Sequence, residues 1–542
     1  MTSHFTSTLP PSYQQQYTYE EEEYDGSEQL HSGTYIEHSL NHSVVPYIPT
    51  HQSGLVKHYL DHVLQRQYLL ADSSIAAFII RTVQQNPAVR DAVCLLASLH
   101  QESIRRGHPS SALAIHEGTS SDSSKAYKRI CESLYSSTQG SYTEGEAMAG
   151  LFVVSAFLFR GGRGAWQHFL AVATEWVWNV LNTGADPAET ILRCSDSQQF
   201  VIKTTFWFDI LASTTRLEPP RFLHFYRKLW SSSERGAYIE ASTTNPGGAG
   251  SAPPTATANG HHHQPHYASP LSMISVMGCE NNTALAIAET SALACWKVAH
   301  ERQGRLSVPD LVDRGRKIEK DCLLSAVPSS SSMQQQVPPP GGVYYPAGGG
   351  IPDELSEKRR LTADIFRATA RVYLHSVISG EHPGCPEIRD GVRETIDCLQ
   401  RVPAGGVGGG DGNGGTSVAR SVLRSVVFGI CLCGCLADDP KDREFLLRRL
   451  NAEEQAEGVG NCTSACLVMQ EVWRRRAPCI NNNNNNSSNN NNSNNNAGGN
   501  GSGASGCCGD STASSSTLPP SSPCLSWREA TQQFGGESLL LV

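Results

Sequence analysis

Cysteine and histidine are the residue types in this sequence that invite metal chemistry, since its 542 residues include 17 cysteines and 19 histidines. A structural zinc site needs four closely placed thiolates or imidazoles, commonly in Cys-X2-Cys or His-X3–5-His pairs. The sequence contains no Cys-X2-Cys pair. The nearest approaches are Cys431 with Cys433 and Cys435, Cys462 with Cys466, and the adjacent Cys507 and Cys508.

Two of these metal candidates have simpler interpretations. Cys431 and Cys435 share one face of a helix but lie in an apolar run, where cysteine behaves as a small core residue. The histidine run from His261 to His266 lies in a stretch rich in Gly, Ser and Pro, which offers no second shell to orient the rings. We therefore predict buried thiols in the first case and a linker in the second, and we assign no metal ligand.

One Gly-rich segment could bind an anion, and the sequence also contains potential nucleophiles. The segment Arg160–Ala165 is Gly-rich and precedes a helix, where backbone amides can bind an anion. It lacks the Gly-Lys-Ser/Thr ending of a phosphate-binding loop, so we predict a permissive turn between two buried helices. No Gly-X-Ser-X-Gly elbow is present, and the scattered His, Ser and Asp residues form no assignable triad. We assign no catalytic or cofactor-binding residue and expect that the chain is not an enzyme.

The charge balance limits nucleic-acid binding. The net charge is −9 and the pI about 6.1, whereas neutralising many phosphates requires clustered Lys and Arg. Three short basic segments occur, at Arg314–Lys317, Lys358–Arg360 and Arg474–Arg476. They are either solvated faces of helices or signals for nuclear import. Any binding of DNA must therefore be local or supplied by another module.

The elements that would position these residues are amphipathic helices. Apolar residues recur at three-and-four spacing from Leu55 to Leu64, from Val89 to Leu99 and, most clearly, from Trp166 to Leu181. Asn86 and Pro87 suit the cap and first position of the second helix, and Gly184 suits the end of the third. Further stripes are predicted at 198–217, 221–230, 283–299, 311–324, 361–378 and 388–399.

These stripes define the expected fold and its interruptions. Period-two alternation bounded by hairpin turns is almost absent, so we predict an all-α fold, a large array of packed antiparallel helices with long disordered inserts. Residues 1–50 are predicted to be a disordered acidic and polar tail, and residues 51–535 the helical domain. The predicted disordered inserts lie at 231–269, 327–350, 404–416 and 477–523.

The tail contains an acidic and aromatic patch from Tyr17 to Asp25. Acidic residues mixed with aromatic ones serve either as an activation segment or simply as a solvated tail. Neither a secretory signal at Met1–Gly26 nor an apolar run of about 18 residues is present, so we expect an intracellular chain with no membrane span. The scattered, odd number of cysteines then favours reduced thiols.

The order of these segments resembles the fungal-specific transcription factor domain, a helical regulatory region of zinc-cluster transcription factors. The likeness is carried by Val56–Leu64, by the Asn86-Pro87 helix ending in Ala97–His100, and by Trp166–Ala173. It continues in Gly434–Arg443, where Asp439 is a good cap and Pro440 fits the first helical position. Val472–Arg475 and Ser526–Glu529 resemble the closing elements of the family.

The resemblance implies a transcription regulator that acts in the nucleus through the transcription machinery or co-regulator proteins, and it is compatible with a homodimer. The six-cysteine zinc cluster usual in the family is absent from the sequence. We therefore expect no cofactor in this chain, with zinc only in a cluster encoded upstream, and contact with DNA only indirectly or through such a module. The alternative hypothesis is a helical protein-interaction scaffold unrelated to transcription.

Overall fold

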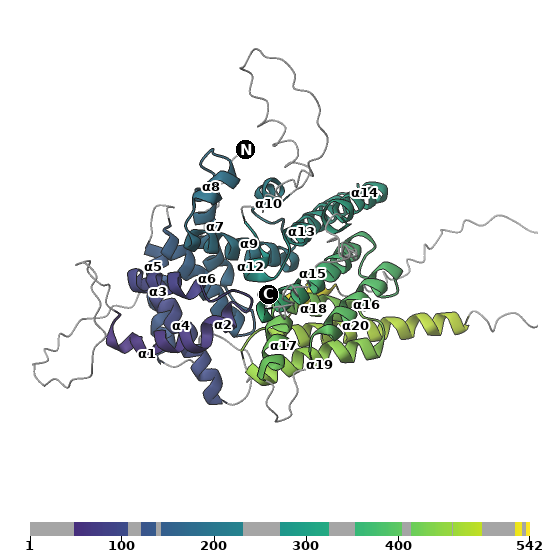
Figure 1. Ribbon diagram of the computed structural model, residues 1–542. Helices are drawn as coiled ribbons and strands as arrows, with labels where there is room; N and C mark the ends of the chain where they lie inside the picture. Colours follow the sequence, from purple (N-terminus) through teal and green to yellow (C-terminus); the bar gives the residue numbers. More distant parts are fainter. Residues whose placement is uncertain are drawn as a thin grey trace, which may run out of the picture. The chain divides into compact units, whose positions relative to one another are not determined.

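Helices make up the regular structure of the described chain (Figure 1), and no strand occurs there. The computed structural model describes residues 48–106, 121–136, 142–230, 271–324, 353–403, 413–457, 459–489, 526–533 and 538–542. The all-α prediction is confirmed. The predicted inserts at 231–269 and 327–350, and the predicted tail up to residue 47, lie outside the described residues.

The first half of the described chain runs from α1 to α10. Its helices are α1 (Thr50–His58), the π-helix η1 (Tyr59–Val63), α2 (Leu64–Gln67), α3 (Ile75–Gln85), α4 (Pro87–Arg106), α5 (Ser121–Ser136), α6 (Glu144–Phe159), α7 (Trp166–Leu181), α8 (Pro187–Arg193), α9 (Asp196–Arg216) and α10 (Leu223–Trp230).

The second half runs from α12 to α21. Its helices are α12 (Ile274–Met277), α13 (Asn281–Arg302), α14 (Val308–Ile318), the π-helix η2 (Glu319–Leu324), α15 (Glu354–Ile378), α16 (Pro386–Arg401), α17 (Asn413–Ser425), α18 (Val427–Leu436), α19 (Pro440–Glu457), α20 (Cys462–Asn489) and α21 (Trp527–Gln533).

Side-chain caps explain where several helices begin. The Asn86 side chain accepts a hydrogen bond from the Val89 amide at 3.1 Å, and Pro87 opens α4 as predicted. Asp439 accepts from the Lys441 amide at 2.8 Å before Pro440 opens α19. These caps satisfy amides that have no partner within the helix, so the local sequence alone determines these starts.

The centre of the first half is α6, which packs against both α4 and α7. The helix is apolar on all sides, with Phe152 and Val153 fully buried, so no amphipathic stripe predicted it. Gly150 allows the close approach of α7, because a Cβ there would lie 2.6 Å from the Phe169 carbonyl oxygen. The predicted stripe of α7 is confirmed by the burial of Trp166 and its successors.

The second half is organised around α15, which packs against α13, α16, α17 and α18. The helix α18 is buried along its whole length, and the prediction that Cys431 and Cys435 are core thiols is confirmed by their full burial. Among the described helices none is singly long and apolar enough to span a membrane. By length and composition, α17 and α18 pass that test only as a pair bent by 65°.

Three predicted boundaries differ from the structure. The helix α17 begins at Asn413, inside the predicted insert 404–416, and α20 continues to Asn489, inside the predicted insert 477–523. Extending a packed helix fixes one residue for each hydrogen bond gained, so helices continue past the apolar stripe that nucleates them. The helical body also extends beyond 535, because Leu539, Leu540 and Leu541 are fully buried.

Candidate functional site

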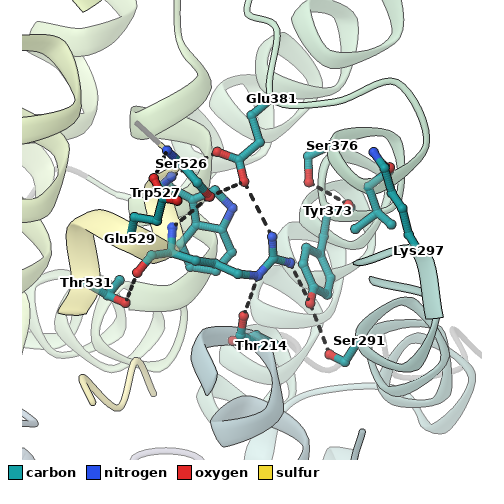
Figure 2. Close-up of polar contacts among 12 residues, drawn as sticks. Thr214, Ser291, Lys297, Tyr373, Ser376, Glu381, Ser526, Trp527, Glu529 and Thr531 are labelled. Atoms are coloured by element: carbon teal, nitrogen blue, oxygen red, sulfur yellow. Dashed lines mark hydrogen bonds and ion pairs between the residues drawn. The ribbon is translucent and has the colours of Figure 1, made fainter. Parts of the chain in front are cut away.

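An arginine with a largely buried side chain joins helices that are distant in the sequence (Figure 2). Arg528 on α21 donates from Nε to the Thr214 carbonyl oxygen of α9 at 2.9 Å. Its Nη2 donates to the Tyr373 hydroxyl of α15 at 3.0 Å, and its Nη1 forms an ion pair with Glu381 at 3.4 Å. We call Arg528 and the residues that bind it the Arg528 junction.

Other groups complete the Arg528 junction. Glu381 accepts from the Ser526 hydroxyl at 2.8 Å and from the Trp527 amide at 2.9 Å. The Tyr373 hydroxyl lies 3.1 Å from the Ser291 hydroxyl of α13. The Arg528 guanidinium lies over the Trp527 ring, 4.7 Å from its centroid. The side chains of Arg528 and Glu381 are only 12% and 17% exposed, so their ion pair is largely shielded from solvent.

The chemistry of this junction is binding rather than catalysis. Both carboxylate oxygens of Glu381 accept hydrogen bonds, and the guanidinium of Arg528 donates to three partners. A buried charge is tolerated only when it is paired and hydrogen-bonded in this way. The junction therefore fixes α21 against α9 and α15, and it offers no unsatisfied acid or base to a substrate.

The Gly-rich segment after α6 binds residues 538–542. The Leu540 amide donates to the Gly162 carbonyl oxygen at 2.8 Å, and Asn461 donates to the Leu540 carbonyl oxygen at 2.9 Å. The Trp166 indole donates to the Ser538 carbonyl oxygen at 2.9 Å. Gly162 has φ +77°, a conformation that glycine adopts without strain. The predicted permissive turn is confirmed, and it serves as the docking point for residues from the far end of the sequence.

A buried aspartate fixes the corner between α9 and α10. Asp209 accepts hydrogen bonds from the Tyr226 hydroxyl at 2.8 Å and from the amides of Arg221 and Phe222 at 3.0 and 3.2 Å. Burial raises the pKa of Asp209 above its ordinary value, because the charged form loses solvation, and these hydrogen bonds oppose the rise only in part. The Asp209 side chain is thus a structural acceptor of hydrogen bonds in the interior.

An open groove lies between α13 on one side and α14 with η2 on the other. Its volume is about 600 Å³. We call it the α13–α14 groove, and it is lined by Arg227, Leu285, Glu289, Ala292, Leu293, Trp296, Arg314, Lys317, Ile318, Asp321 and Cys322. Leu285, Leu293, Ile318 and Cys322 are buried and form an apolar floor, while the charged residues form the rim.

The rim of the α13–α14 groove contains two ordered guanidinium groups. Arg227 binds Glu289 through two hydrogen bonds of 2.6 and 2.7 Å. Arg314 binds Asp310 at 3.0 Å and lies over the Trp296 ring, 4.5 Å from its centroid. This combination of an apolar floor and fixed charges can bind an amphipathic ligand.

The thiol of Cys322 in the groove floor is not a nucleophile. Burial, with a smaller contribution from the nearby carboxylates of Glu289 and Asp321, raises its pKa to about 12. A thiol reacts as the thiolate, whose population is very small at neutral pH when the pKa is that high. Cys322 therefore contributes apolar contact.

A second hollow lies between α2, α6, α9 and α18. It has a volume of about 90 Å³, with Gln67, Ser155, Trp207 and Asn461 among its lining residues. Gln67 is already bonded to Tyr59 and Ser155. A space of this size accommodates a few water molecules at most, so it is the weaker candidate for a ligand site.

The three basic segments have different environments. Arg316 and Arg474 are exposed and paired with nearby carboxylates, as expected of solvated helix faces. Arg359 instead donates to the Leu70 carbonyl oxygen at 2.9 Å, and Arg476 is 7% exposed and donates to the Cys435 carbonyl oxygen. The solvated-face interpretation is wrong for these two, because backbone carbonyls from distant segments bind their guanidinium groups.

The remaining metal candidates are two cysteine pairs and the histidine run. Cys462 and Cys466 are buried core residues, and no group of three potential metal ligands converges among the described residues. The histidine run 261–266 and the pair Cys507 and Cys508 lie outside the described residues. Sequence reasoning missed the Arg528 junction, whose only local signal was the Ser526–Glu529 block.

Comparison with known proteins gives one family. The fungal-specific transcription factor domain matches residues 54–541. The chain is 26% identical over 206 residues to the trichothecene biosynthesis transcription regulator TRI10 of Trichoderma arundinaceum, covering 38% of this chain and 40% of that protein. It is 29% identical over 132 residues to the ustiloxin B cluster transcription factor ustR of Aspergillus flavus, covering 24% of this chain and 20% of that protein.

A third relative matches over nearly the same length as the first. The chain is 24% identical over 201 residues to TRI10 of Fusarium sporotrichioides, covering 37% of this chain and 39% of that protein. The matched parts thus span at most 40% of the length of these relatives. No solved structure is significantly similar to the chain.

Proposed function

The chain belongs to the family of the fungal-specific transcription factor domain, and from this we propose that it is a transcription regulator acting in the nucleus. The observation that carries the proposal is the extent of the match, residues 54–541, which includes the helical body from α1 to the docked residues 538–541. A match of this extent favours regulation of transcription over a helical scaffold unrelated to it.

We propose that the chain works through protein contacts rather than by catalysis. Its largely buried ionisable groups, at the Arg528 junction and at Asp209, are hydrogen-bonded to residues outside their own helices, and the Cys322 thiol stays protonated. These groups stabilise one arrangement of the helices, which is what a surface for the transcription machinery or for co-regulator proteins requires. We further propose that the chain needs no cofactor of its own and contacts DNA only indirectly or through another module.

A tethering experiment tests the regulatory function. The full chain is fused to an unrelated DNA-binding domain and placed at a reporter promoter, and reporter transcripts are measured. We expect a change of several-fold relative to the DNA-binding domain alone, because a regulator recruits or blocks the transcription machinery. A fluorescent fusion of the chain is expected in the nucleus.

A matched variant separates regulation from nonspecific effects. Trp166→Asp places a charge at a fully buried position and is expected to unfold the body and abolish the reporter effect. Arg393→Ala changes an exposed side chain and is expected to keep it. An unchanged reporter, together with a fusion that stays in the cytoplasm, would contradict the proposed function.

A further inference from the structure

We propose that the α13–α14 groove binds a small amphipathic monoanion, whose acidic group lies on Lys317 and Arg314 and whose apolar body lies on the floor. The groove volume of about 600 Å³ falls within the range of roughly 300–1,000 Å³ that is typical of small-molecule sites. Such sites combine apolar walls with a few placed polar groups. The α13–α14 groove has both.

One cation of the rim is available to a ligand, because Arg227 and Arg314 are each paired with a carboxylate, Glu289 and Asp310 respectively. The charged lining residues are Arg227 and Glu289 on one side, and Arg314, Lys317 and Asp321 on the wall formed by α14 and η2. The bidentate pair between Arg227 and Glu289 neutralises one charge of each sign. Lys317 is exposed and makes no ion pair with any described residue, so its ammonium group is available to an anion.

The same rim limits the charge of the ligand to one. Asp321 also lines the groove and lies four residues after Lys317 in the sequence. A second negative charge on the ligand would be repelled by this carboxylate. The groove therefore favours a carboxylate or sulfonate with a single charge over a dianion such as a phosphate monoester.

Trp296 holds the second cation in place. Arg314 covers one side of its ring, and His300 packs against the same indole with the ring centroids 4.3 Å apart. Asp310 binds the guanidinium at 3.0 Å. A guanidinium ordered before the ligand arrives loses less entropy on binding, so Arg314 is preorganised for an acidic group.

The wall formed by η2 is an independent indication of a functional site. Residues Glu319–Leu324 form a π-helix, a rare conformation that occurs frequently at functional sites. This segment contributes Asp321 and Cys322 to the groove. The wider turn thus supplies both the carboxylate that selects a monoanion and part of the apolar floor.

The proposal goes beyond regulation of transcription and is tested on the purified full chain, so its failure leaves the reporter experiment unaffected. The probe is 8-anilinonaphthalene-1-sulfonate, an aromatic monoanion whose fluorescence rises in an apolar site. We expect saturable binding to one site. Its uncharged analogue N-phenyl-1-naphthylamine is expected to bind about tenfold more weakly, because it lacks the group that Lys317 and Arg314 bind.

Matched variants locate the binding site of the probe. Lys317→Gln removes the rim cation and is expected to weaken sulfonate binding about five- to tenfold, while binding of the uncharged analogue stays the same. Lys320→Gln changes an exposed lysine that does not line the groove and should bind like the unchanged chain. Ala292→Phe fills the groove and should abolish binding of both probes.

Both groove variants are expected to keep the fold, so a change in probe binding reports on the groove itself. Lys317 is exposed and Ala292 is half-buried, so circular dichroism and thermal melting should match those of the unchanged chain. The proposal is overturned if the chain does not bind the sulfonate, or if folded Lys317→Gln binds it as tightly as the unchanged chain does. Equal weakening by Lys320→Gln would also overturn it, since that result indicates general charge attraction.

Discussion

Arg528 and Arg314 each lie over an aromatic ring, but their surroundings differ. The Arg528 side chain is 12% exposed and bridges α9, α15 and Glu381, whereas the Arg314 side chain is 50% exposed and pairs within its own helix. The guanidinium of Arg528 is held by three partners from distant parts of the chain. Arg314 lies on the rim of the α13–α14 groove next to Lys317, which makes no ion pair with a described residue.

This difference has an energetic basis. A buried ion pair costs much desolvation, so losing one partner leaves a charge that nothing else neutralises. An exposed pair gains little because water competes for both partners. The Arg528 junction therefore maintains the fold, whereas the exposed charges of the α13–α14 groove contribute little to it.

The largest effect is expected from Arg528→Ala. The change leaves the Glu381 carboxylate without its ion-pair partner, and it removes the guanidinium that donates to the Tyr373 hydroxyl. We expect the free energy of unfolding to fall by about 3–5 kcal/mol, measured by urea denaturation followed by circular dichroism. A loss below about 1 kcal/mol would mean that Arg528 contributes no more to stability than a surface arginine does.

A second prediction tests how residues 538–542 dock. Gly162→Ala places a Cβ 2.5 Å from the Leu540 carbonyl oxygen, in addition to the strain of its positive φ. Gly184→Ala has a similar φ of +83° but meets no atom within 4 Å. Strain alone costs roughly 1–2 kcal/mol in each variant, so Gly162→Ala should lose clearly more stability in urea. Equal losses would mean that residues 538–542 contribute nothing to holding the body together.

A third prediction uses the pH dependence of the interior. The pKa of Asp209 is raised, so the stability that its protonated form contributes is present below the ordinary pKa and is lost as pH rises through the raised value. Asp209→Asn does not titrate. The stability difference between the unchanged chain and this variant should therefore become smaller from about pH 4 towards neutrality, as measured by urea midpoints at several pH values. A difference that grows with pH would indicate that the hydrogen bonds outweigh desolvation.

The smallest effect is expected from Arg314→Ala. Its ion pair with Asp310 joins side chains that are 50% and 45% exposed. We expect a loss below about 1 kcal/mol in urea, together with weaker binding of 8-anilinonaphthalene-1-sulfonate. A loss comparable to that of Arg528→Ala would make the rim of the groove a structural element and would remove the contrast between the two regions.

The helices that follow from local sequence were predicted well. The stripe of α7 from Trp166 onward, the cap at Asn86 and the start of α19 at Pro440 are all observed. In each case residues within one or two turns determine the structure, by periodic burial or by satisfying free amides. The apolar helix α6 has no such signal, because burial on all sides erases the periodicity.

The helical fold, the starts of several helices and the burial of Cys431 and Cys435 all follow from the sequence alone. The role of each arginine depends on how the helices pack. Thr214 and Arg528 are 314 residues apart, and nothing between them in the sequence indicates that they meet. The α13–α14 groove likewise exists only after two helices pack side by side. Local free energies select helices, whereas long-range burial decides which charges are held in the interior and which remain available to a ligand.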